Sequence, residues 1–333
     1  MSIQVIRPGL LTSIQDLGRY GMQKHGVIVS GGMDAFALRV ANILVGNEEG
    51  EAALEITLQG PKLHFTEDSL IAICGGNLSP AVDGQAIPQW RPVFIKKGSM
   101  LSFGAVKSGC RAYLAAAGGL DVPMVMNSRS TYLRAGIGGF HGRALKDGDV
   151  LKVQTPSELA IRRMRHLSDK AGAKPFAVSD WSVSKEMLPT YFSRSVIRVI
   201  RGGQFHWFTS ESRELFFKEE FFVTPQSDRM GYRLSGQKLE LSQPRELVSE
   251  AVTAGTIQVP SEGYPIVLMA DRQTTGGYPK IAQVASVDLP ILAQLKPGEK
   301  IRFQEIQLEE AQELLRRRET EMQLLKHGVY LKE

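Results

Sequence analysis

The sequence predicts a mostly β protein made of two related halves, with a few short helices and a helix at the C-terminus. Short apolar runs bounded by glycine and proline recur along the chain, as is typical of strands. Similar turn-and-strand segments also recur at a nearly constant offset, which indicates an internal duplication. Many short strands with few helices favour closed or partly closed barrels.

The duplication is visible in three aligned pairs of segments. The first two pairs share one offset, and a loop-sized insertion separates them from the third. In the third pair a glycine turn leads into an alternating strand, and this pattern occurs once more in the chain. The pairs are 55–60 with 250–255, 70–74 with 265–269, and 95–103 with 295–303, and the additional copy of the turn is 145–153.

Helices are predicted at four places. Asp34 is a suitable N-cap for a stretch with a helical apolar stripe, and Gly46 follows the end of that stretch. The four segments are 34–46, 157–167, 210–217 and 308–326. The predicted organisation is 1–155 for the N-terminal β-barrel half, 156–194 for a helix and an irregular linker, 195–305 for the C-terminal half, and 306–333 for the C-terminal helix.

Bulk composition is that of an ordinary globular protein, with 43% hydrophobic and 23% charged residues. The net charge is +5, but the densest basic cluster, 316–318, lies among glutamates and indicates a solvated helix face, not a nucleic-acid contact. An acidic small molecule or partner fits this charge. The N-terminus has no apolar leader, and no stretch of about 18 apolar residues occurs, so we expect a cytoplasmic protein without a membrane segment.

The chemistry-bearing residues do not form the motifs of a self-contained enzyme. Cys74 and Cys110 belong to no Cys/His cluster, and the six histidines show no ligand spacing, so no metal site is predicted. The sequence has no G-x-S-x-G, no H-E-x-x-H and no phosphate-binding G-x-x-x-x-G-K motif. It therefore predicts a site that acts only together with a partner.

Polar residues gather instead in four clusters near glycines. The first and third clusters each combine an aspartate, an arginine and a tyrosine, and arginine offers a planar fork for a carboxylate or phosphate. Aspartate–arginine pairs that only pin a loop are the alternative. In the second cluster the glycines are interpreted as turns, with Arg129, Arg134 and Arg143 as a candidate anion-binding rim. The clusters are 15–34, 128–143, 226–233 and 271–280.

The fourth cluster is the most informative stretch of the chain. It directly follows the apolar run 266–270, which predicts a buried strand that ends in a polar loop. Binding sites are commonly built from such loops, although a surface hairpin with solvated ends is the alternative. Within the loop, Lys280 offers a point charge for an anionic group, Tyr278 a donor to a carbonyl oxygen, and Gln273 an amide partner.

These clusters, in this order, resemble the biotin-dependent carboxyltransferase (allophanate hydrolase subunit 2) family. Within it they are most similar to the C subunits of 5-oxoprolinase, also described as KipA, the antagonist of KipI. The resemblance extends from Ile3 to Phe303, and Asn127 stands where the family has glycine. It rests on the segments RPGLLTSIQDLGRYGMQKHGVIVSGGMD, NSRSTYLRAGIGGFHGRALKDGD, TPQSDRMGYRLSG and GTIQVPSEGYPIVLMADRQTTGGYPKIA, of which the QTTGGYPK block is the most specific.

The resemblance implies two cyclophilin-like β-barrel halves. It also implies membership of an ATP-dependent 5-oxoprolinase complex, which converts 5-oxoproline to L-glutamate and in which a KipI-like protein is the B subunit, with a further, A subunit as the third member. ATP is then a co-substrate of the complex, and this chain shows no metal site and no biotin-accepting lysine motif of its own. Two alternatives stay open: a regulatory protein that sequesters the kinase inhibitor KipI in sporulation control, and a carboxyltransferase-type subunit.

We predict that the third and fourth clusters converge on one cleft, because equivalent loops of duplicated barrels lie on equivalent faces. The predicted catalytic residues are Asp228, Arg229, Gln273, Tyr278 and Lys280. The predicted substrate-binding residues are Asp16, Arg19, Tyr20, Arg129, Ser130, Tyr232, Asp271, Thr274, Gly276 and Gly277.

Overall fold

The computed structural model describes residues 1–189, 191 and 196–332, and these form two compact units. Unit 1 consists of Met1–Arg19, Asp34–Leu188 and Thr320–Glu333, and unit 2 of Tyr20–Met33 and Pro189–Glu319. The short segment Tyr20–Met33 therefore packs with the C-terminal half of the sequence. The predicted boundary at residues 194 and 195 lies outside the described residues.

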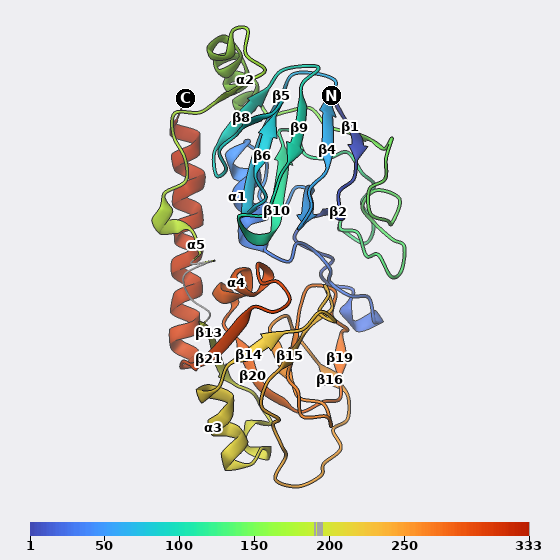
Figure 1. Cartoon of the computed structure of the whole chain (residues 1–333), viewed down its shortest axis with the longest axis vertical. Coiled ribbons are helices and arrows are strands. Elements are labelled where there is room, and N and C mark those ends of the chain that lie inside the picture. The colour runs from blue at the N-terminus through green and yellow to red at the C-terminus, as the bar shows by residue number, and fades with distance from the viewer. Residues whose placement is uncertain (190, 192–195, 333) are drawn as a thin grey trace. The chain divides into compact units, whose positions relative to one another are not determined.

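Unit 1 is built on two six-stranded sheets that share a hydrophobic core (Figure 1). Its strands are β1 (Ser2–Arg7), β2 (Leu11–Gln15), β3 (Ala53–Thr57), β4 (Lys62–Phe65), β5 (Ser69–Asn77), β6 (Pro80–Val82), β7 (Gln85–Ala86), β8 (Pro92–Ile95), β9 (Met100–Phe103), β10 (Ser108–Ala116), β11 (Val150–Lys152) and β12 (Phe176–Val178). The order is β11-β1-β4-β9-β6-β7 in the first sheet and β12-β8-β5-β10-β3-β2 in the second. Ile3 of the first sheet and Ile71 of the second belong to the same core.

Helices cover the other face of the second sheet. Strand β5 shows the arrangement: Ile71 and Ile73 face the core between the sheets, whereas Ala72 and Cys74 belong to a second core under α1 (Ala35–Leu44) and α2 (Glu158–Ala171). Because β5 is buried on both faces, its sequence is a continuous apolar run instead of an alternating one. Met322 of α5 (Leu308–Leu331) joins this second core.

Unit 2 contains a closed seven-stranded barrel. Its strands are β13 (Val196–Arg201), β14 (Phe221–Val223), β15 (Gly231–Ser235), β17 (Thr256–Gln258), β18 (Ile266–Leu268), β20 (Lys280–Val284) and β21 (Lys300–Glu305), in the order β13-β20-β17-β18-β15-β14-β21. On the helix α3 (Ser210–Lys218), Phe216 stacks on Phe303 of β21 with ring centroids 4.6 Å apart. Among the described residues, unit 2 also contains the two-stranded sheet of β16 (Glu250–Ala251) and β19 (Thr275–Gly276), the helix α4 (Leu289–Ala293), and 3-10 turns at Gln23–His25, Phe205–Trp207 and Ser286–Asp288, and unit 1 has a further 3-10 turn at Lys185–Met187.

The turn that repeats in the sequence has the same backbone geometry in all three copies. Gly98, Gly148 and Gly298 have φ values of 84°, 83° and 87°, a region that favours glycine. Each glycine N–H donates to the carbonyl of a residue in a neighbouring strand, and each turn leads into a strand: β9, β11 or β21. The acceptors are Phe65 at 2.7 Å, Val5 at 2.8 Å and Val223 at 2.8 Å. Two copies lie in unit 1 and one in unit 2.

The mostly-β fold class is confirmed, and so are the predicted helix starts. Asp34 accepts a hydrogen bond from the Ala37 amide at 2.9 Å, and Ser157 accepts one from Ala160 at 3.3 Å. Three features differ from the expectation: α2 and α5 extend beyond their predicted ends, α4 was not predicted, and the strands of unit 1 form two sheets, whereas the closed barrel is in unit 2. The second sheet of unit 1 is covered on both sides, which a three-layer arrangement provides.

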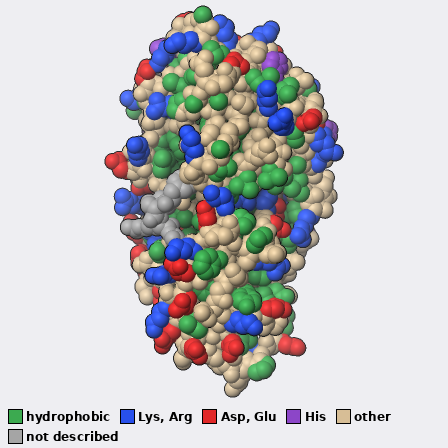
Figure 2. All heavy atoms as spheres, viewed as in Figure 1, with side chains coloured by type: hydrophobic (Ala, Val, Ile, Leu, Met, Phe, Trp, Pro, Cys, Tyr) green, Lys and Arg blue, Asp and Glu red, His purple; other side chains and the backbone are tan. Residues whose placement is uncertain are grey.

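Basic and acidic side chains lie next to one another over much of the face shown in Figure 2.

Among the described residues, no helix has the length and apolar character needed to cross a membrane.

Candidate functional site

The register of two barrel strands brings the third and fourth polar clusters together. Strands β15 and β18 are antiparallel, with Gly231 opposite Leu268. The chain that enters β15 therefore runs beside the chain that leaves β18, and the Asp271 amide donates to the Arg229 carbonyl at 2.8 Å. This places the side chains of Arg229 and Asp271 within contact of each other at the start of the 271–280 loop.

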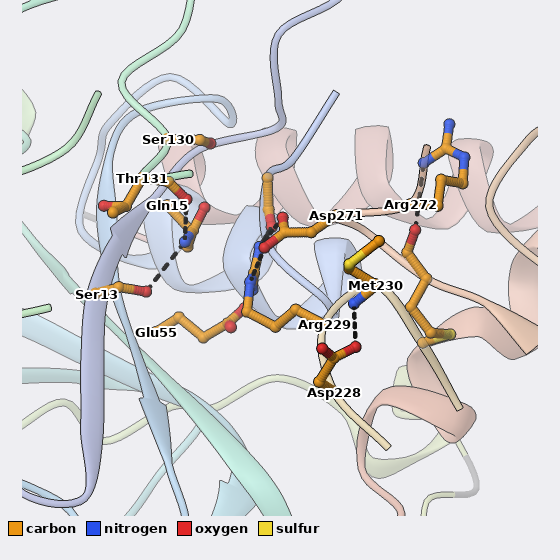
Figure 3. A network of polar contacts seen from close by, with 12 residues as sticks. Ser13, Gln15, Glu55, Ser130, Thr131, Asp228, Arg229, Met230, Asp271 and Arg272 are labelled. Carbon is orange, nitrogen blue, oxygen red and sulfur yellow. Dashed lines mark hydrogen bonds and ion pairs between the residues drawn. The ribbon is translucent and has the colours of Figure 1, made fainter. Parts of the chain in front are cut away.

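Arg229 and Asp271 form a buried, two-pronged ion pair, drawn in Figure 3. The Nε and Nη2 atoms of Arg229 each donate to one carboxylate oxygen of Asp271 at 2.9 Å, and Nη2 also donates to the Gly31 carbonyl at 2.6 Å. The exposed fractions are 7% for Arg229 and 5% for Asp271. Both carboxylate oxygens are used by this pair, so its role in this structure is to hold the loop and the segment around Gly31 on the barrel.

Asp228, predicted to be catalytic, lies beside this pair and is exposed. Its Oδ1 atom accepts hydrogen bonds from the Met230 amide at 2.8 Å and the Gly231 amide at 3.3 Å, so it stabilises the turn that enters β15. Tyr232, predicted to bind substrate, is buried in the barrel core, and its hydroxyl donates to the Leu295 carbonyl at 3.4 Å. In this structure its side chain is a core group.

The far end of the loop carries a second ion pair. Lys280 pairs with Glu250, which β16 holds opposite the loop because Glu250 pairs with Gly276 of β19. The Gln204 side chain connects to both residues: its Nε2 donates to Glu250 at 3.3 Å, and its Oε1 accepts from the Lys280 amide at 3.2 Å. The hydrogen bond from Lys280 lowers the pKa of the Glu250 carboxyl below its ordinary value. Lys280 is thus held beside a half-exposed carboxylate.

The middle of the loop presents its polar side chains to solvent. Gln273 is exposed, Thr274 is half-buried, and Tyr278 is 50% exposed. The glycines have a different role from the predicted one of letting the backbone approach a ligand. A Cβ atom on Gly276 would lie 2.5 Å from Nε2 of Gln258, and one on Gly277 would lie 3.1 Å from the Leu247 carbonyl. Their small size lets the loop pack on the protein itself.

A cavity of about 900 Å³ adjoins the loop within unit 2. The loop contributes Gly277, Tyr278 and Pro279 to its wall, and the opposite wall comes from the segments before and after β17. The remaining lining residues are Lys238, Leu239, Glu240, Leu241, Pro244, Arg245, Glu246, Leu247, Val259, Pro260, Ser261, Glu262 and Gly263. Gly277 and Tyr278 are therefore the predicted site residues that border this cavity.

In unit 1, the first and second clusters interlock around Asp16. Its carboxylate accepts hydrogen bonds from the Gly18 amide at 2.8 Å, the Ser128 hydroxyl at 2.8 Å, the Arg129 amide at 2.5 Å and the Ser130 hydroxyl. An aspartate with four donors fixes the turn around Ser128.

Arg19 contacts the same turn through two backbone carbonyls. Its guanidinium is fully buried and donates to the Val125 carbonyl at 2.9 Å and the Ser130 carbonyl at 2.8 Å. In this structure Asp16, Arg19 and Ser130, which were predicted to bind substrate, stabilise the loop. Asn127 in this turn has φ 61°, in the left-handed region that asparagine tolerates better than most residues, so the departure from glycine keeps the turn.

The other predicted residues of these clusters are dispersed. Arg129 pairs with Glu51 at 3.3 Å, and Arg143 pairs with Asp149 at 2.7 Å, so two arginines of the proposed rim have carboxylate partners. Tyr20 is 64% exposed and belongs to unit 2. Among the residues that the structure describes, no group of three or more His, Cys, Asp or Glu side chains is placed to hold a metal ion.

The family model for the carboxyltransferase domain, subdomains A and B, matches residues 25–305. The chain belongs to this carboxyltransferase-domain family. The match includes both the 226–233 and 271–280 clusters, whereas Asp16, Arg19 and Tyr20 precede it.

Curated relatives in the carboxyltransferase-domain family match over nearly the whole chain. A protein of Escherichia coli (strain K12), named as the C subunit of 5-oxoprolinase, is 40% identical over 310 residues, which is 93% of each chain. Its namesake from Haemophilus influenzae is 39% identical over 307 residues, 92% of each chain. Among solved structures, the K. lactis urea amidolyase has a TM-score of 0.86 and 33% identity over 97% of this chain, which corresponds to 20% of the amidolyase chain.

Two polar residues inside these clusters were not singled out from the sequence. Gln15 is fully buried and donates to Ser13 at 3.0 Å and to the Thr131 carbonyl at 3.2 Å, while its Oε1 atom has no hydrogen-bond partner among the described residues. Arg272 follows directly on Asp271, yet its guanidinium forms no ion pair with any described residue. Neither property has a signal in the sequence, because both depend on what surrounds the side chain.

A third missed group lies under α1 in unit 1. The Tyr113 hydroxyl donates to Glu55 at 2.7 Å and accepts from the Asp34 amide at 2.8 Å, and all three residues are buried. Burial, and then the neighbouring Glu55 charge, raise the pKa of Tyr113 well above its ordinary value. The group anchors the start of the helix on the sheet.

Proposed function

We propose that this chain is one of the subunits of an ATP-dependent 5-oxoprolinase complex that converts 5-oxoproline to L-glutamate. The observation that carries the proposal is the match to the E. coli relative named as the C subunit of 5-oxoprolinase, because 40% identity extends over 93% of both chains. A match over 310 residues of a 333-residue chain includes residues of both units, so it concerns the whole arrangement and not one shared motif.

In this proposal the complex has two further members, a KipI-like B subunit and an A subunit. The complex acts in the cytoplasm. The relatives' names describe them as subunits, which supports a multi-chain enzyme. In the K. lactis urea amidolyase the corresponding part is one fifth of a longer chain, so the same scaffold there forms part of a larger polypeptide. The ion-paired states of Arg229 and Lys280 also fit a site that becomes active when a partner completes it.

The chemical problem is the low reactivity of a lactam. In the proposed reaction the lactam carbonyl oxygen attacks the γ-phosphorus of ATP, and ADP leaves. Water then adds to the activated carbon, the C–N bond breaks, and the nitrogen takes a proton. The product of this step is an acyl phosphate, and a second water attacks its carbonyl carbon and displaces inorganic phosphate, which gives glutamate. Groups that donate hydrogen bonds to the developing negative charge accelerate such steps.

This chain contributes the 271–280 loop to that chemistry. Lys280 offers a positive charge once a ligand anion replaces Glu250, Tyr278 offers a hydroxyl donor at the edge of the cavity, and Gln273 offers an exposed amide that can pair with a lactam. Arg229 and Asp271 hold the loop in place. In this proposal they are positioning residues, not groups that touch the substrate.

A carboxyltransferase-type activity is the second candidate. The TM-score of 0.86 and 33% identity to the K. lactis urea amidolyase favour it, because the scaffold is conserved over 97% of this chain. Both candidates place an amide-like substrate on the same loop, so the distinguishing property is the reaction and not the site.

The test is glutamate formation from 5-oxoproline and ATP by the reconstituted complex, with each member omitted in turn. We expect no glutamate without this chain, and a strong loss with Lys280→Ala. Lys300→Ala is the matched control, because Lys300 also forms an ion pair in the barrel, with Glu220 at 3.0 Å, but lies outside the loop. Full activity without this chain would contradict the proposal, and binding to the KipI-like partner without any effect on turnover would favour a regulatory role.

A further inference from the structure

Arg272 differs from Arg229 and Lys280, the other two cations of the third and fourth clusters that are not exposed. The side chains of Arg229 and Lys280 pair with Asp271 and Glu250. Arg272 makes one long hydrogen bond, from Nη1 to the Met269 carbonyl at 3.4 Å. Its Nε atom is buried and has no hydrogen-bond partner among the described residues, and no described carboxylate pairs with it. Figure 3 shows its guanidinium turned away from the Arg229–Asp271 pair.

Among the described residues, the partly buried guanidinium of Arg272 has no opposite charge beside it that would offset the loss of hydration. Burial lowers the pKa of Arg272 from its ordinary value, although the group stays charged because arginine does not lose its proton in proteins. A partly buried charge is unfavourable unless an opposite charge and hydrogen bonds replace the lost water. Asp271 is the nearest carboxylate in sequence, but both of its oxygens already accept from Arg229. An external anion is therefore the partner that this side chain lacks.

We propose that Arg272 binds the carboxylate of the lactam substrate and selects substrates that carry one. The inference rests on the proposed function, because 5-oxoproline is a lactam with one carboxylate. The planar guanidinium fork matches a carboxylate with two parallel hydrogen bonds. A single unpaired cation among the described residues of the loop suits a monoanion better than the polyphosphate of a nucleotide, which several donors usually hold.

The neighbouring residues fit this assignment. Gln273 follows Arg272 directly and is exposed, so a substrate held by its carboxylate at Arg272 has an amide partner next to it in the chain. Tyr20 is the ionisable group that interacts with Arg272, and its exposed hydroxyl offers a further donor for the same anion. Selection then arises because a lactam without a carboxylate leaves the buried guanidinium unpaired.

The test compares 5-oxoproline with 2-pyrrolidinone, the same lactam without the carboxylate. In the reconstituted complex, Arg272→Gln is expected to lower kcat/KM for 5-oxoproline by about 10- to 100-fold, mainly through KM, as expected for loss of hydrogen bonds to a charged group. KM for ATP and the activity on 2-pyrrolidinone should stay unchanged. Arg272→Lys, which keeps the charge but not the fork, should give an intermediate KM. Arg233→Gln is the control, because Arg233 is an exposed arginine of the same barrel.

A binding experiment on the full chain alone separates this inference from the proposed function. We expect 5-oxoproline, but not 2-pyrrolidinone or inorganic phosphate, to shift the Nε–H NMR resonance of Arg272. If the complex makes no glutamate but this shift occurs, the proposed function fails and the carboxylate site stands. If the complex is active while Arg272→Gln leaves KM for 5-oxoproline unchanged, or raises KM for ATP instead, the inference is wrong. Absence of the shift also contradicts it.

Discussion

Replacing Asp271 with alanine removes the carboxylate partner of a buried guanidinium. Arg229 is 7% exposed, and two of its hydrogen bonds, each 2.9 Å long, go to Asp271. In Asp271→Ala the charge stays buried, with the Gly31 carbonyl as a remaining acceptor. Breaking one side of such a pair lowers the free energy of unfolding by about 3–5 kcal/mol. At about 2–4 °C for each kcal/mol in a unit of this size, the melting temperature falls by about 6–20 °C.

Thermal unfolding followed by circular dichroism measures this loss of stability. Two further variants serve as controls for its interpretation. Glu305→Ala removes the partner of the more exposed Arg201 and should change stability by about 0–1 kcal/mol. Arg229→Met combined with Asp271→Leu removes both charges and should recover much of the stability that Asp271→Ala loses. If Asp271→Ala melts within about 1 °C of the wild type, the reasoning that this pair holds the loop on the barrel is refuted.

Three further changes test other parts of the structure. Asn127→Val should lower the free energy of unfolding by about 1–2 kcal/mol relative to Asn127→Gly, because φ is 61° at this position; equal chemical denaturation curves would contradict this. Asp16→Asn weakens the acceptor of four hydrogen bonds, so amide hydrogen exchange at Arg129 should accelerate, and unchanged exchange would contradict the role assigned to Asp16. The folded pKa of Glu250 is lowered by Lys280, so the pair stabilises the fold above the unfolded glutamate pKa of about 4.3 and this contribution is lost as pH falls through the folded value. In an NMR titration Glu250 should therefore have a lower midpoint in the wild type than in Lys280→Met, and equal midpoints would contradict the pairing.

Local signals in the sequence are sufficient to predict helix caps and tight turns. The N-cap at Asp34 and the turns at Gly98, Gly148 and Gly298 follow from backbone requirements of single residues, and the structure has them where predicted. The run 70–74 predicts a buried strand, which the structure confirms as part of β5. Whether its two faces meet a second sheet or a helix depends on chain segments far away in the sequence, so the layered arrangement of unit 1 was not predictable from it.

For the candidate site, too, the sequence identifies the segments, but the surroundings of each side chain become known only from the fold. The sequence predicts that the segments 226–233 and 271–280 contribute to one site, and the register of β15 with β18 does bring Arg229 to Asp271. It could not separate Tyr232 in the barrel core from Tyr278 at the cavity, because the two tyrosines differ only in their surroundings. Arg272 was missed for a related reason: its distinguishing property is that both oxygens of the adjacent carboxylate are already occupied.

The central claim is that this chain is required for a 5-oxoprolinase complex. The most direct measurement is a titration of the purified chain into fixed amounts of the two candidate partner proteins, with glutamate formed from 5-oxoproline and ATP as the readout. We predict no glutamate at zero added chain, a rise in rate with added chain, and saturation at a fixed stoichiometric ratio. A full rate in the absence of this chain, or no glutamate at any ratio, would contradict the claim.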